Sequence, residues 1–452
     1  MVKQLLLLIL AIFIISGCGS NKDELSADNP VTLTMWHVYG NSTRSPLNNL
    51  IDKFNATEGK EQGVAIRVIS VSTSSKIDRV LLSSIANEPG SVPLPDLFTA
   101  YPRIINNIDT NLLLNWKDYL STEELSLYQQ KFIQEGTYNN ELLMLPIAKS
   151  ADILFVNHTY FEDFAAATGH TIADLNDFNR IFAMCSDYYR WSGGKNFFQM
   201  DDIYNYFLIN MASLGDDFIK NGKPDLYSSN FIRIYNPMAR AAIEGGMSVS
   251  NGYSSNRWKT GNLVCYTGSS ASILYQRDYI INNDNTKEPL DAFYLSYPIF
   301  HKYQGRHALI YRGAGLFALK SNEERKNLGA AVFAKWIGEK ENNLAFVTKA
   351  GYLPVNQAAL SELSITKREN IDSRYRKIYN AITKDGNDVY YITFPLYKTT
   401  MVTQKNIENY TRQILTTCNR EYLRRISQGN DKEAVLNELT EYSLRQLQLQ
   451  MQ

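Results

Sequence analysis

The chain has 452 residues, and its 46 basic and 46 acidic side chains balance to a formal net charge of zero. A nucleic-acid-binding protein would carry a clustered basic excess, so this balance argues against a nucleic-acid partner. Hydrophobic residues make up 44% of the chain, which is typical of a globular protein, and the length allows two or three domains.

Residues 1–17 have the pattern of a secretory signal peptide. Lys3 gives a cationic start, Leu5–Ile15 is an unbroken apolar run, and small residues precede Cys18. The run is too short to span a bilayer as a resident helix. The four residues that end at Cys18 resemble the bacterial lipobox, which implies cleavage before Cys18 and lipid on that cysteine. The alternative is an ordinary signal peptide that happens to contain a cysteine.

The part of the chain that follows predicts a tether and then a β-α-β-α-β unit. Residues 18–30 are small and polar, as in a flexible, lipidated tether. The expected elements are strands at 31–35, 65–71 and 95–100, with helices that begin at Ser45-Pro46 and cover 77–85. This order predicts a parallel, doubly wound sheet. Ligands of such sheets lie beyond the carboxyl ends of the strands, which selects residues 36–43, 72–75 and 100–103.

A second α/β region is expected after Leu145-Pro146. Its elements are predicted to be a strand at 152–157, helices at 160–168 and 176–186, a mostly helical stretch at 191–214, a strand at 262–267, a strand, charged turn and helix over 316–337, and helices from Glu408 onward. The alternation of strands and helices again favours an α/β domain.

The polar residues do not have the spacing of a catalytic or metal site. The five histidines show no metal-ligand spacing, and no Gly-x-Ser-x-Gly motif occurs. Gly313-Ala314-Gly315 lacks the third glycine of a dinucleotide fingerprint. Asp201-Asp202 and Asp216-Asp217 could suggest a glycosidase pair, but neighbours in sequence usually point apart. We therefore interpret both pairs as solvated acidic caps, and we expect no catalytic residue, metal or cofactor.

Five segments, in chain order, resemble motifs of the extracellular solute-binding proteins of ABC importers, the class that contains maltose- and glycerol-3-phosphate-binding proteins. The segments are Thr34–His37, Leu145-Pro146 with Ile153–Asn157, Gly313–Ala318, Ala330–Trp336 and Lys349–Asn356. The last of them is the most specific, because it is close to the family's Gly-Tyr-Leu-Pro-Val segment. Their order, together with the lipobox, identifies the chain by resemblance as a member of this family.

The resemblance implies an α/β, two-lobe, periplasmic-binding-protein-like fold of type II, in which each lobe is a doubly wound sheet and the ligand cleft lies at the hinge. Lobe 1 would comprise residues 31–145 and 305–345, and lobe 2 residues 146–304 and 346–452. Closure around a small solute would present a docking surface to a membrane permease. The resemblance further implies a monomeric receptor that catalyses nothing, on the extracytoplasmic face of the cell membrane. A receptor that signals to a membrane sensor would have the same sequence features.

A sugar site requires aromatic platforms and hydrogen-bonding partners for hydroxyl groups. Trp36 and Tyr39 follow the first predicted strand, and Tyr101 follows the third. By resemblance to the glycerol-3-phosphate binders, the positions that match ligand contacts are Tyr101, Ser150, Ser270, Gly313 and Tyr352. A plain structural role remains the alternative for each of these residues.

Two departures from the glycerol-3-phosphate binders favour a neutral sugar or oligosaccharide as the ligand. Those proteins have a glutamate after the tyrosine that matches Tyr101, whereas this chain has Pro102. Their late arginine has no counterpart here, where only Lys398 is available, although Arg103 or Arg312 could substitute. A phosphate requires charge-assisted donors. Glycerol 3-phosphate or another phosphodiester remains the alternative ligand, and a surface hydrolase lipoprotein is the alternative from another class, which substrate turnover would reveal.

Overall fold

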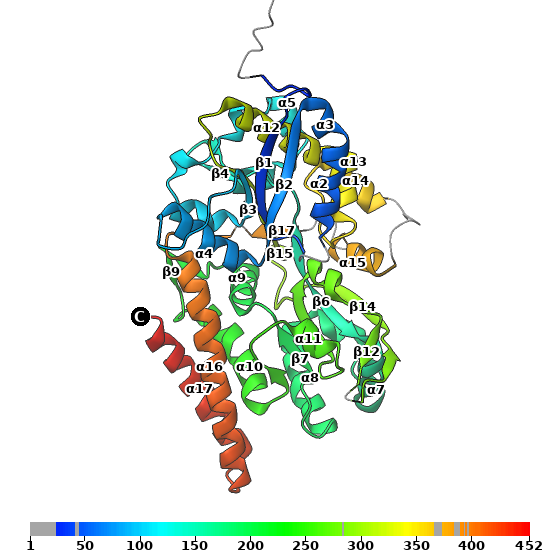
Figure 1. The fold of residues 1–452 in the computed structure, drawn as a ribbon. Coiled ribbons are helices and arrows are strands. Elements are labelled where there is room, and N and C mark those ends of the chain that lie inside the picture. Colours follow the sequence, from blue (N-terminus) through cyan, green and yellow to red (C-terminus); the bar gives the residue numbers. More distant parts are fainter. Residues whose placement is uncertain are drawn as a thin grey trace, which may run out of the picture.

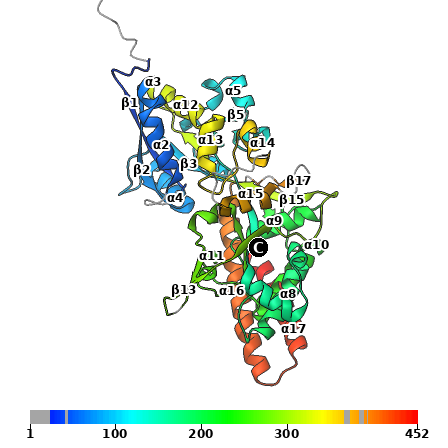
Figure 2. The same cartoon turned by 90° about the vertical axis from the view of Figure 1, so that its right-hand side faces the viewer.

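The computed structural model describes residues 24–40, 45–282, 284–365, 373–383, 389–392, 394–395 and 397–452. The predicted signal peptide (1–17), Cys18 and the start of the tether lie outside the described residues. The chain folds into two lobes, one above the other in Figure 1 and side-on in Figure 2. Within the described ranges, no helix combines the length and the apolar character needed to cross a membrane.

The upper lobe in Figure 1 is built on a four-stranded sheet in the order β16-β3-β1-β2. β1 (Val31–His37) pairs in parallel with β2 (Val64–Val71) and β3 (Leu97–Ala100), and β16 (Gly315–Ala318) is antiparallel to β3. The three predicted strands and their parallel order are thus confirmed. The late strand β16 completes the sheet, so residues far apart in the sequence share one core.

Helices cover this sheet, and the first of them, α2, begins at the predicted start, Ser45-Pro46. Ser45 Oγ accepts a hydrogen bond from the Asn48 N–H at 3.1 Å, and Pro46 lies in the first turn of α2. The elements of the upper lobe besides its sheet are α2 (Pro46–Ala56), α3 (Glu58–Gln62), α4 (Ser74–Ile85), η1 (Pro102–Asn107), η2 (Thr110–Leu112), η3 (Trp116–Asp118), α5 (Thr122–Ser126), α6 (Gln130–Glu135), β4 (Thr137–Tyr138), β5 (Glu141–Leu142), α12 (Glu324–Gly338) and α13 (Lys340–Val347).

The lower lobe is built on a seven-stranded sheet in the order β10-β7-β11-β6-β15-β17, with β14 also paired to β6. Its strands are β6 (Ser150–Asn157), β7 (Phe198–Met200), β10 (Met247–Ser248), β11 (Cys265–Ser269), β14 (Ala292–Ser296), β15 (His307–Arg312) and β17 (Val389–Ile392). Every residue of β6 is buried, as expected of a central strand. β7 runs parallel to β10 and β11, so their carboxyl ends lie at one edge of the sheet.

The remaining elements of the lower lobe are mainly helices. They are α7 (His158–Thr168), η4 (Ile172–Asn176), α8 (Phe178–Trp191), α9 (Ile203–Ser213), β8 (Ile219–Lys220), β9 (Lys223–Pro224), α10 (Ser229–Glu244), α11 (Ser254–Trp258), η5 (Ser270–Tyr275), β12 (Tyr279–Ile281), β13 (Lys287–Pro289), α15 (Ser373–Thr383), α16 (Thr400–Ser427) and α17 (Lys432–Gln450). α14 (Gln357–Ile365) lies beside α13 of the upper lobe (Figures 1 and 2). α16 begins eight residues before the predicted start at Glu408, and with α17 it forms a hairpin that points away from the upper lobe (Figure 1).

One predicted element is wrong in part. Residues 191–214 were expected to be mostly helical, but β7 lies between α8 and α9. A short apolar run such as Phe197–Met200 fits a helix and a buried strand equally well by periodicity. Pairing with β10 and β11, which come from later in the chain, makes it a strand.

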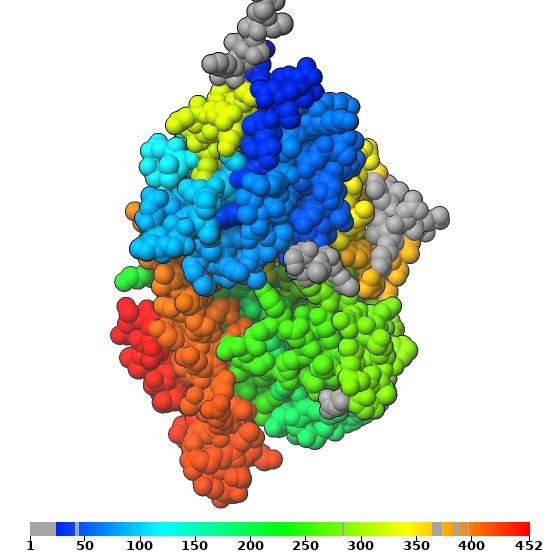
Figure 3. Space-filling view, viewed as in Figure 1, coloured from blue at the N-terminus to red at the C-terminus, as the bar shows by residue number. Residues whose placement is uncertain are grey.

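The lobes lie against each other along a seam, and the upper end of α16 reaches this seam (Figure 3). The chain crosses between the lobes at residues 146–149, at 313–314 and near Leu353. Lys149 N–H donates to the carbonyl of Leu353 at 3.1 Å, so two of these crossings run side by side. A Cβ on Gly313 would lie 2.3 Å from the Ala148 carbonyl oxygen, so the first two crossings also touch.

The crossing points differ from the predicted lobe boundaries. Residues 305–312 were assigned to lobe 1, but β15 pairs with β6 and β17 in the sheet of the lower lobe. Lobe 1 was expected to end at residue 345, yet Phe346 and Val347 pack in the core of the upper lobe. Both differences have the same reason: an apolar segment near a crossing can complete either core, and the sequence pattern does not say which.

Candidate ligand-binding site

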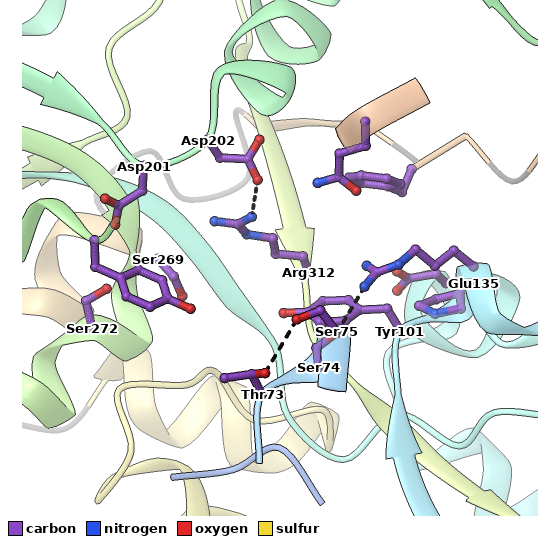
Figure 4. A pocket seen from close by; sticks show the side chains of 15 residues that line it. Thr73, Ser74, Ser75, Tyr101, Glu135, Asp201, Asp202, Ser269, Ser272 and Arg312 are labelled. Atoms are coloured by element: carbon purple, nitrogen blue, oxygen red, sulfur yellow. Dashed lines mark hydrogen bonds and ion pairs between the residues drawn. The ribbon is translucent and has the colours of Figure 1, made fainter. Parts of the chain in front are cut away.

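A cavity of about 320 Å³ lies between the two lobes (Figure 4). The upper lobe contributes Thr73, Ser74, Ser75, Tyr101, Pro102, Arg103 and Glu135 to its lining, and the rest of the chain contributes Asp201, Asp202, Tyr253, Ser269, Ser272, Arg312, Phe394 and Gln404. The volume falls at the small end of the range for small-molecule sites, roughly 300–1,000 Å³. The lining combines aromatic rings with many hydroxyl and carboxylate oxygens.

The upper lobe positions its part of the lining at the carboxyl ends of two parallel strands. Thr73–Ser75 follow β2 and begin α4, and Tyr101 and Arg103 follow β3. These are two of the three segments that the sheet rule selected. Of the third segment, residues 36–40 are not part of the lining, and residues 41–43 lie outside the described part of the chain.

The lower lobe follows the same rule. Asp201 and Asp202 come directly after β7, and Ser269 and Ser272 lie at the end of the neighbouring strand β11. Figure 4 shows these residues and Thr73–Ser75 on different sides of the cavity, with Arg312 between them. Because β7 and β11 are parallel, their carboxyl ends deliver a pair of carboxyls and a pair of hydroxyls to one edge of the cavity.

Arg312, the last residue of β15, bridges two carboxylates. Its Nη1 lies 2.7 Å from Asp202 Oδ2, and its Nη2 lies 2.6 Å from Asp152 Oδ1. Asp152 is only 2% exposed and also accepts a hydrogen bond from Asn205 Nδ2 at 2.9 Å. Burial raises the pKa of the Asp152 carboxyl, while the charge of Arg312 opposes that rise. The guanidinium group of Arg312 is therefore already paired with two carboxylates, those of Asp152 and Asp202.

The other cationic groups at the cavity are also paired. Arg103 Nη2 lies 2.9 Å from Asp78 Oδ2, and its guanidinium lies over the Tyr101 ring at 4.8 Å. Lys149, which is 1% exposed, forms a hydrogen-bonded ion pair with Glu135. Since these carboxylates already neutralise the basic side chains, the described residues of the lining offer an anionic ligand no free positive charge.

Asp201 has a different environment. Its Oδ1 accepts a hydrogen bond from the Ser254 N–H at 2.7 Å. Among the described residues, no basic side chain lies within ion-pair distance of its carboxylate. Burial raises the pKa of the Asp201 carboxyl, although hydrogen bonds from Ser254 and the charge of Arg312 act in the opposite direction.

A second carboxyl lies behind Asp202. Glu408 on α16 accepts hydrogen bonds from the Tyr204 N–H at 2.8 Å and from Arg412. Burial and the negative charge of Asp202 raise the pKa of Glu408 to about 8, against the opposing charge of Arg412. Glu408 therefore holds a proton near neutral pH, as expected for two neighbouring carboxyls that cannot both ionise without cost.

Of the seven residues predicted to bind ligand, Tyr101 lines the cavity. The other six lie elsewhere: Trp36, Tyr39, Ser150, Ser270, Gly313 and Tyr352. Trp36 is 4% exposed and packs in a core cluster of the upper lobe. Tyr352 is half-buried, with its ring packed edge-on against that of Tyr39 at 5.2 Å.

Three of these residues connect the crossing segments. The Tyr39 hydroxyl donates to the Ala314 carbonyl, and Ser150 Oγ donates to the Arg312 carbonyl at 3.1 Å. Ser270 Oγ donates to the Gly351 carbonyl at 2.7 Å. Their hydrogen bonds hold the hinge in shape, and a direct contact with ligand remains a prediction for each.

Sequence reasoning missed most of the lining from the lower lobe. The interpretation of Asp201-Asp202 as solvated acidic caps is only partly correct. Asp202 does cap α9, because its carboxylate accepts a hydrogen bond from the Asn205 N–H. However, both carboxyl groups line the interlobe cavity and do not lie on the open surface. The sheet rule would have selected both residues if β7 had been recognised as a strand. No comparable signal pointed to Tyr253, which lies in a loop and is 67% exposed.

The described residues contain no group of three or more His, Cys, Asp or Glu side chains that could hold a metal ion. The acidic side chains at the cavity are engaged with guanidinium groups, with the ammonium group of Lys149, or with backbone N–H groups. The residues that line this site can offer a ligand hydrogen bonds, ring stacking and charge pairing.

Comparisons with known proteins agree with this architecture. A family model for bacterial extracellular solute-binding proteins matches residues 49–372. No curated protein sequence matches the chain. The fold is similar to an ABC substrate-binding protein from Listeria monocytogenes in complex with cycloalternan, with 12% identity, a TM-score of 0.65, and coverage of 92% of this chain and 99% of that one.

Two further solved structures have the same fold. UgpB from Mycobacterium tuberculosis in complex with glycerophosphocholine is 14% identical, with a TM-score of 0.64 over 94% of this chain and 100% of that one. Maltose-bound MalE3 from T. maritima is 15% identical, with a TM-score of 0.61 over 91% and 98%. Identities this low establish the two-lobe fold, while the family match covers most of the chain. The chain belongs to the bacterial extracellular solute-binding proteins.

Proposed function

We propose that this protein is a lipid-anchored extracytoplasmic receptor that captures a carbohydrate between its lobes and delivers it to the permease of an ABC transporter. The observation that carries the proposal is the composition of the interlobe cavity. Thr73, Ser74 and Ser75 face Ser269 and Ser272 across a space that is also lined by aromatic rings. Hydroxyl groups and rings together suit a sugar, which has an apolar face and a belt of hydroxyls.

The charges at the cavity favour a carbohydrate over a phosphodiester. Arg103 and Arg312 are the cations that could hold a phosphate, and both are already paired with carboxylates. A phosphate would also approach Asp201 and Asp202. Among the described residues of the lining, Arg312 offsets this repulsion only in part, because it is shared with Asp152. The structural relatives are consistent with either ligand class, since they include complexes with maltose, cycloalternan and glycerophosphocholine.

The anchor and the receptor role rest on the sequence and the family. Members of this family are binding proteins, which supports a receptor rather than a surface hydrolase. The lipobox-like residues that end at Cys18 support a lipid anchor, and a family described as extracellular supports a location outside the cytoplasm. Delivery to a permease requires a closed state that the partner recognises, as hinged two-lobe proteins provide.

A thermal-shift screen of the purified protein tests the ligand class. The panel contains neutral mono- and oligosaccharides with α-1,4 and β-1,4 linkages, together with glycerol phosphates. A ligand that binds only the folded state at 100 times its Kd adds about 2.7 kcal/mol of stability, so a neutral saccharide should raise the Tm clearly. A rise with glycerol phosphates alone would contradict the carbohydrate assignment.

Tyr101→Ala provides the site-specific control. Loss of this cavity ring should weaken binding of the saccharide at least tenfold, about 1.4 kcal/mol, because stacking and buried area disappear. Tyr442→Ala, on the exposed face of α17, is the matched change and should leave affinity unaltered. Recovery of the saccharide intact after incubation is expected, whereas its hydrolysis by the purified protein would support the surface-hydrolase alternative.

A further inference from the structure

Among the described residues, carboxyl groups outnumber basic groups around the interlobe cavity. The carboxyls that line or back it are Asp78, Glu135, Asp152, Asp201, Asp202 and Glu408, and the basic groups paired with them are Arg103, Lys149, Arg312 and Arg412. If every group were ionised, the enclosed site would carry two uncompensated negative charges. Such charge in a partly desolvated space is costly unless it gains a proton or a cation.

The two uncompensated negative charges can be assigned to particular carboxyl groups. Arg312 serves Asp152 and Asp202 together, so one of these charges lacks a cation of its own. Glu408, whose pKa is raised to about 8, absorbs that surplus by holding a proton near neutral pH. Asp201 is the second carboxyl of the surplus, and within the described structure no Lys, Arg or His side chain pairs with it.

The surroundings of Asp201 are suited to a cationic group of a ligand. In Figure 4 its carboxyl lies beside Ser269 and Ser272 at one side of the cavity. Tyr253 lines the same cavity and is 67% exposed, so its ring is available to a ligand. A carboxylate with a nearby aromatic ring binds an ammonium group through a charge-assisted hydrogen bond and a cation–π contact.

We propose that the ligand carries a basic nitrogen, as in an amino sugar, and that the carboxylate of Asp201 binds it. The inference rests on the proposed carbohydrate-receptor function and narrows it to basic saccharides. An ammonium group would neutralise the remaining charge, whereas a neutral hydroxyl would donate a hydrogen bond to the carboxylate and leave the charge in place. An anionic ligand would add to the surplus.

Matched sugars test the proposal on the unmodified protein. Calorimetry would compare glucose and galactose derivatives in which one hydroxyl, at carbon 2, 3 or 6, is replaced by an amine, together with β-1,4-linked glucosamine disaccharide and cellobiose. The measurements use low ionic strength and a pH at which each amine is protonated. At least one amine is expected to bind tenfold or more tightly than its hydroxyl analogue, and its N-acetyl derivative should lose that advantage.

Variants assign the preference to one carboxylate. Asp201→Asn should reduce the ratio of amine to hydroxyl affinity to near one. Asp217→Asn makes the same change at an exposed position outside the cavity lining and should leave the ratio unchanged. The Tm of each variant confirms that it is folded.

The outcomes separate the two proposals. If neutral sugars bind the unmodified protein as tightly as their amino analogues, the basic-nitrogen inference is overturned while the carbohydrate receptor stands. If neither class binds, both proposals fail. An amine preference that survives Asp201→Asn would also overturn the assignment to Asp201, because another group would then be supplying the charge.

Discussion

At the scale of single residues, Arg312 decides how charge is arranged at the cleft. Its two ion pairs join Asp152 of β6 to Asp202 at the start of α9, so one guanidinium links two elements of the lower lobe. Asp152 is almost completely buried. A buried carboxylate of this kind is stable only with a partner, because desolvation outweighs any other contact it makes.

Arg312→Gln is expected to lower the free energy of unfolding by about 3–5 kcal/mol at neutral pH, because it leaves Asp152 charged, buried and without a cation. Urea denaturation would measure the loss. Arg445→Gln removes an exposed pair with Glu441 and should change stability by no more than about 0.5 kcal/mol. Equal losses in the two variants would contradict the role given to Arg312.

The loss in Arg312→Gln should depend on pH with a definite sign. Without arginine, burial raises the pKa of Asp152 in the folded state above its unfolded value, so the folded variant keeps a proton that the unfolded chain releases. The variant therefore gains stability as pH falls through the raised pKa. Denaturation curves at successive pH values should show the difference from the unmodified protein shrinking towards acid, and parallel profiles would argue against the desolvation cause.

At the scale of elements, the third crossing segment docks on the lower lobe through a glycine. Gly351 has a φ of +70°, and a Cβ there would lie 2.4 Å from Ile273 Cγ2 and 2.7 Å from the Ser270 carbonyl oxygen. The Gly351 carbonyl also accepts from Ser270 Oγ. Both the backbone conformation and the close approach to η5 therefore require glycine at this position.

Gly351→Ala should destabilise the protein by more than the strain alone, which is about 1 kcal/mol or above for alanine at positive φ. Gly429→Ala is the matched control, because Gly429 has a φ of +85° but nothing within 4 Å of its added Cβ. Urea midpoints of the two variants would separate strain from packing. Equal shifts of the urea midpoint in the two variants would show that the contact of Gly351 with η5 does not contribute to stability.

At the scale of the whole molecule, two lobes joined by three crossing segments form a hinge around the cavity. The saccharide that gives the largest thermal shift should lower the radius of gyration in small-angle X-ray scattering, because contacts with both lobes favour the closed state. Tyr101→Ala should need more ligand for the same change. An unchanged radius at saturating ligand would contradict hinge closure.

The anchor is likewise a property of the whole molecule. In its bacterial host, Cys18→Ser should move the protein from the membrane fraction to the soluble fraction and abolish incorporation of a labelled fatty acid, since the proposed acyl chains would have no attachment site. Ser20→Ala changes a nearby residue that carries no lipid and should leave the protein in the membrane fraction. Membrane association that persists in Cys18→Ser would argue for another form of attachment.

Much of the fold follows from local sequence signals. The alternation of Val31, Leu33 and Met35 and the cap at Ser45-Pro46 depend on residues next to one another, so β1 and α2 were predictable. β7 was not, because a short apolar run becomes a strand only when β10 and β11 pair with it. The predicted lobe boundary at residue 305 was wrong for the same reason, because β15 joins the lower lobe through β6, a strand that lies far away in the sequence.

The sequence by itself determined the family, the alternating α/β order and two of the segments at the cavity, 72–75 and 100–103, because these depend on contiguous motifs and on the ends of predictable strands. Only the tertiary structure decided which charges meet there. Arg312 and Asp202 are 110 residues apart, and only the sheet order β7-β11-β6-β15, with α9 packed against β15, brings their side chains to 2.7 Å. Charge pairing at a cleft depends on distance in space, and local periodicity carries no information about that distance.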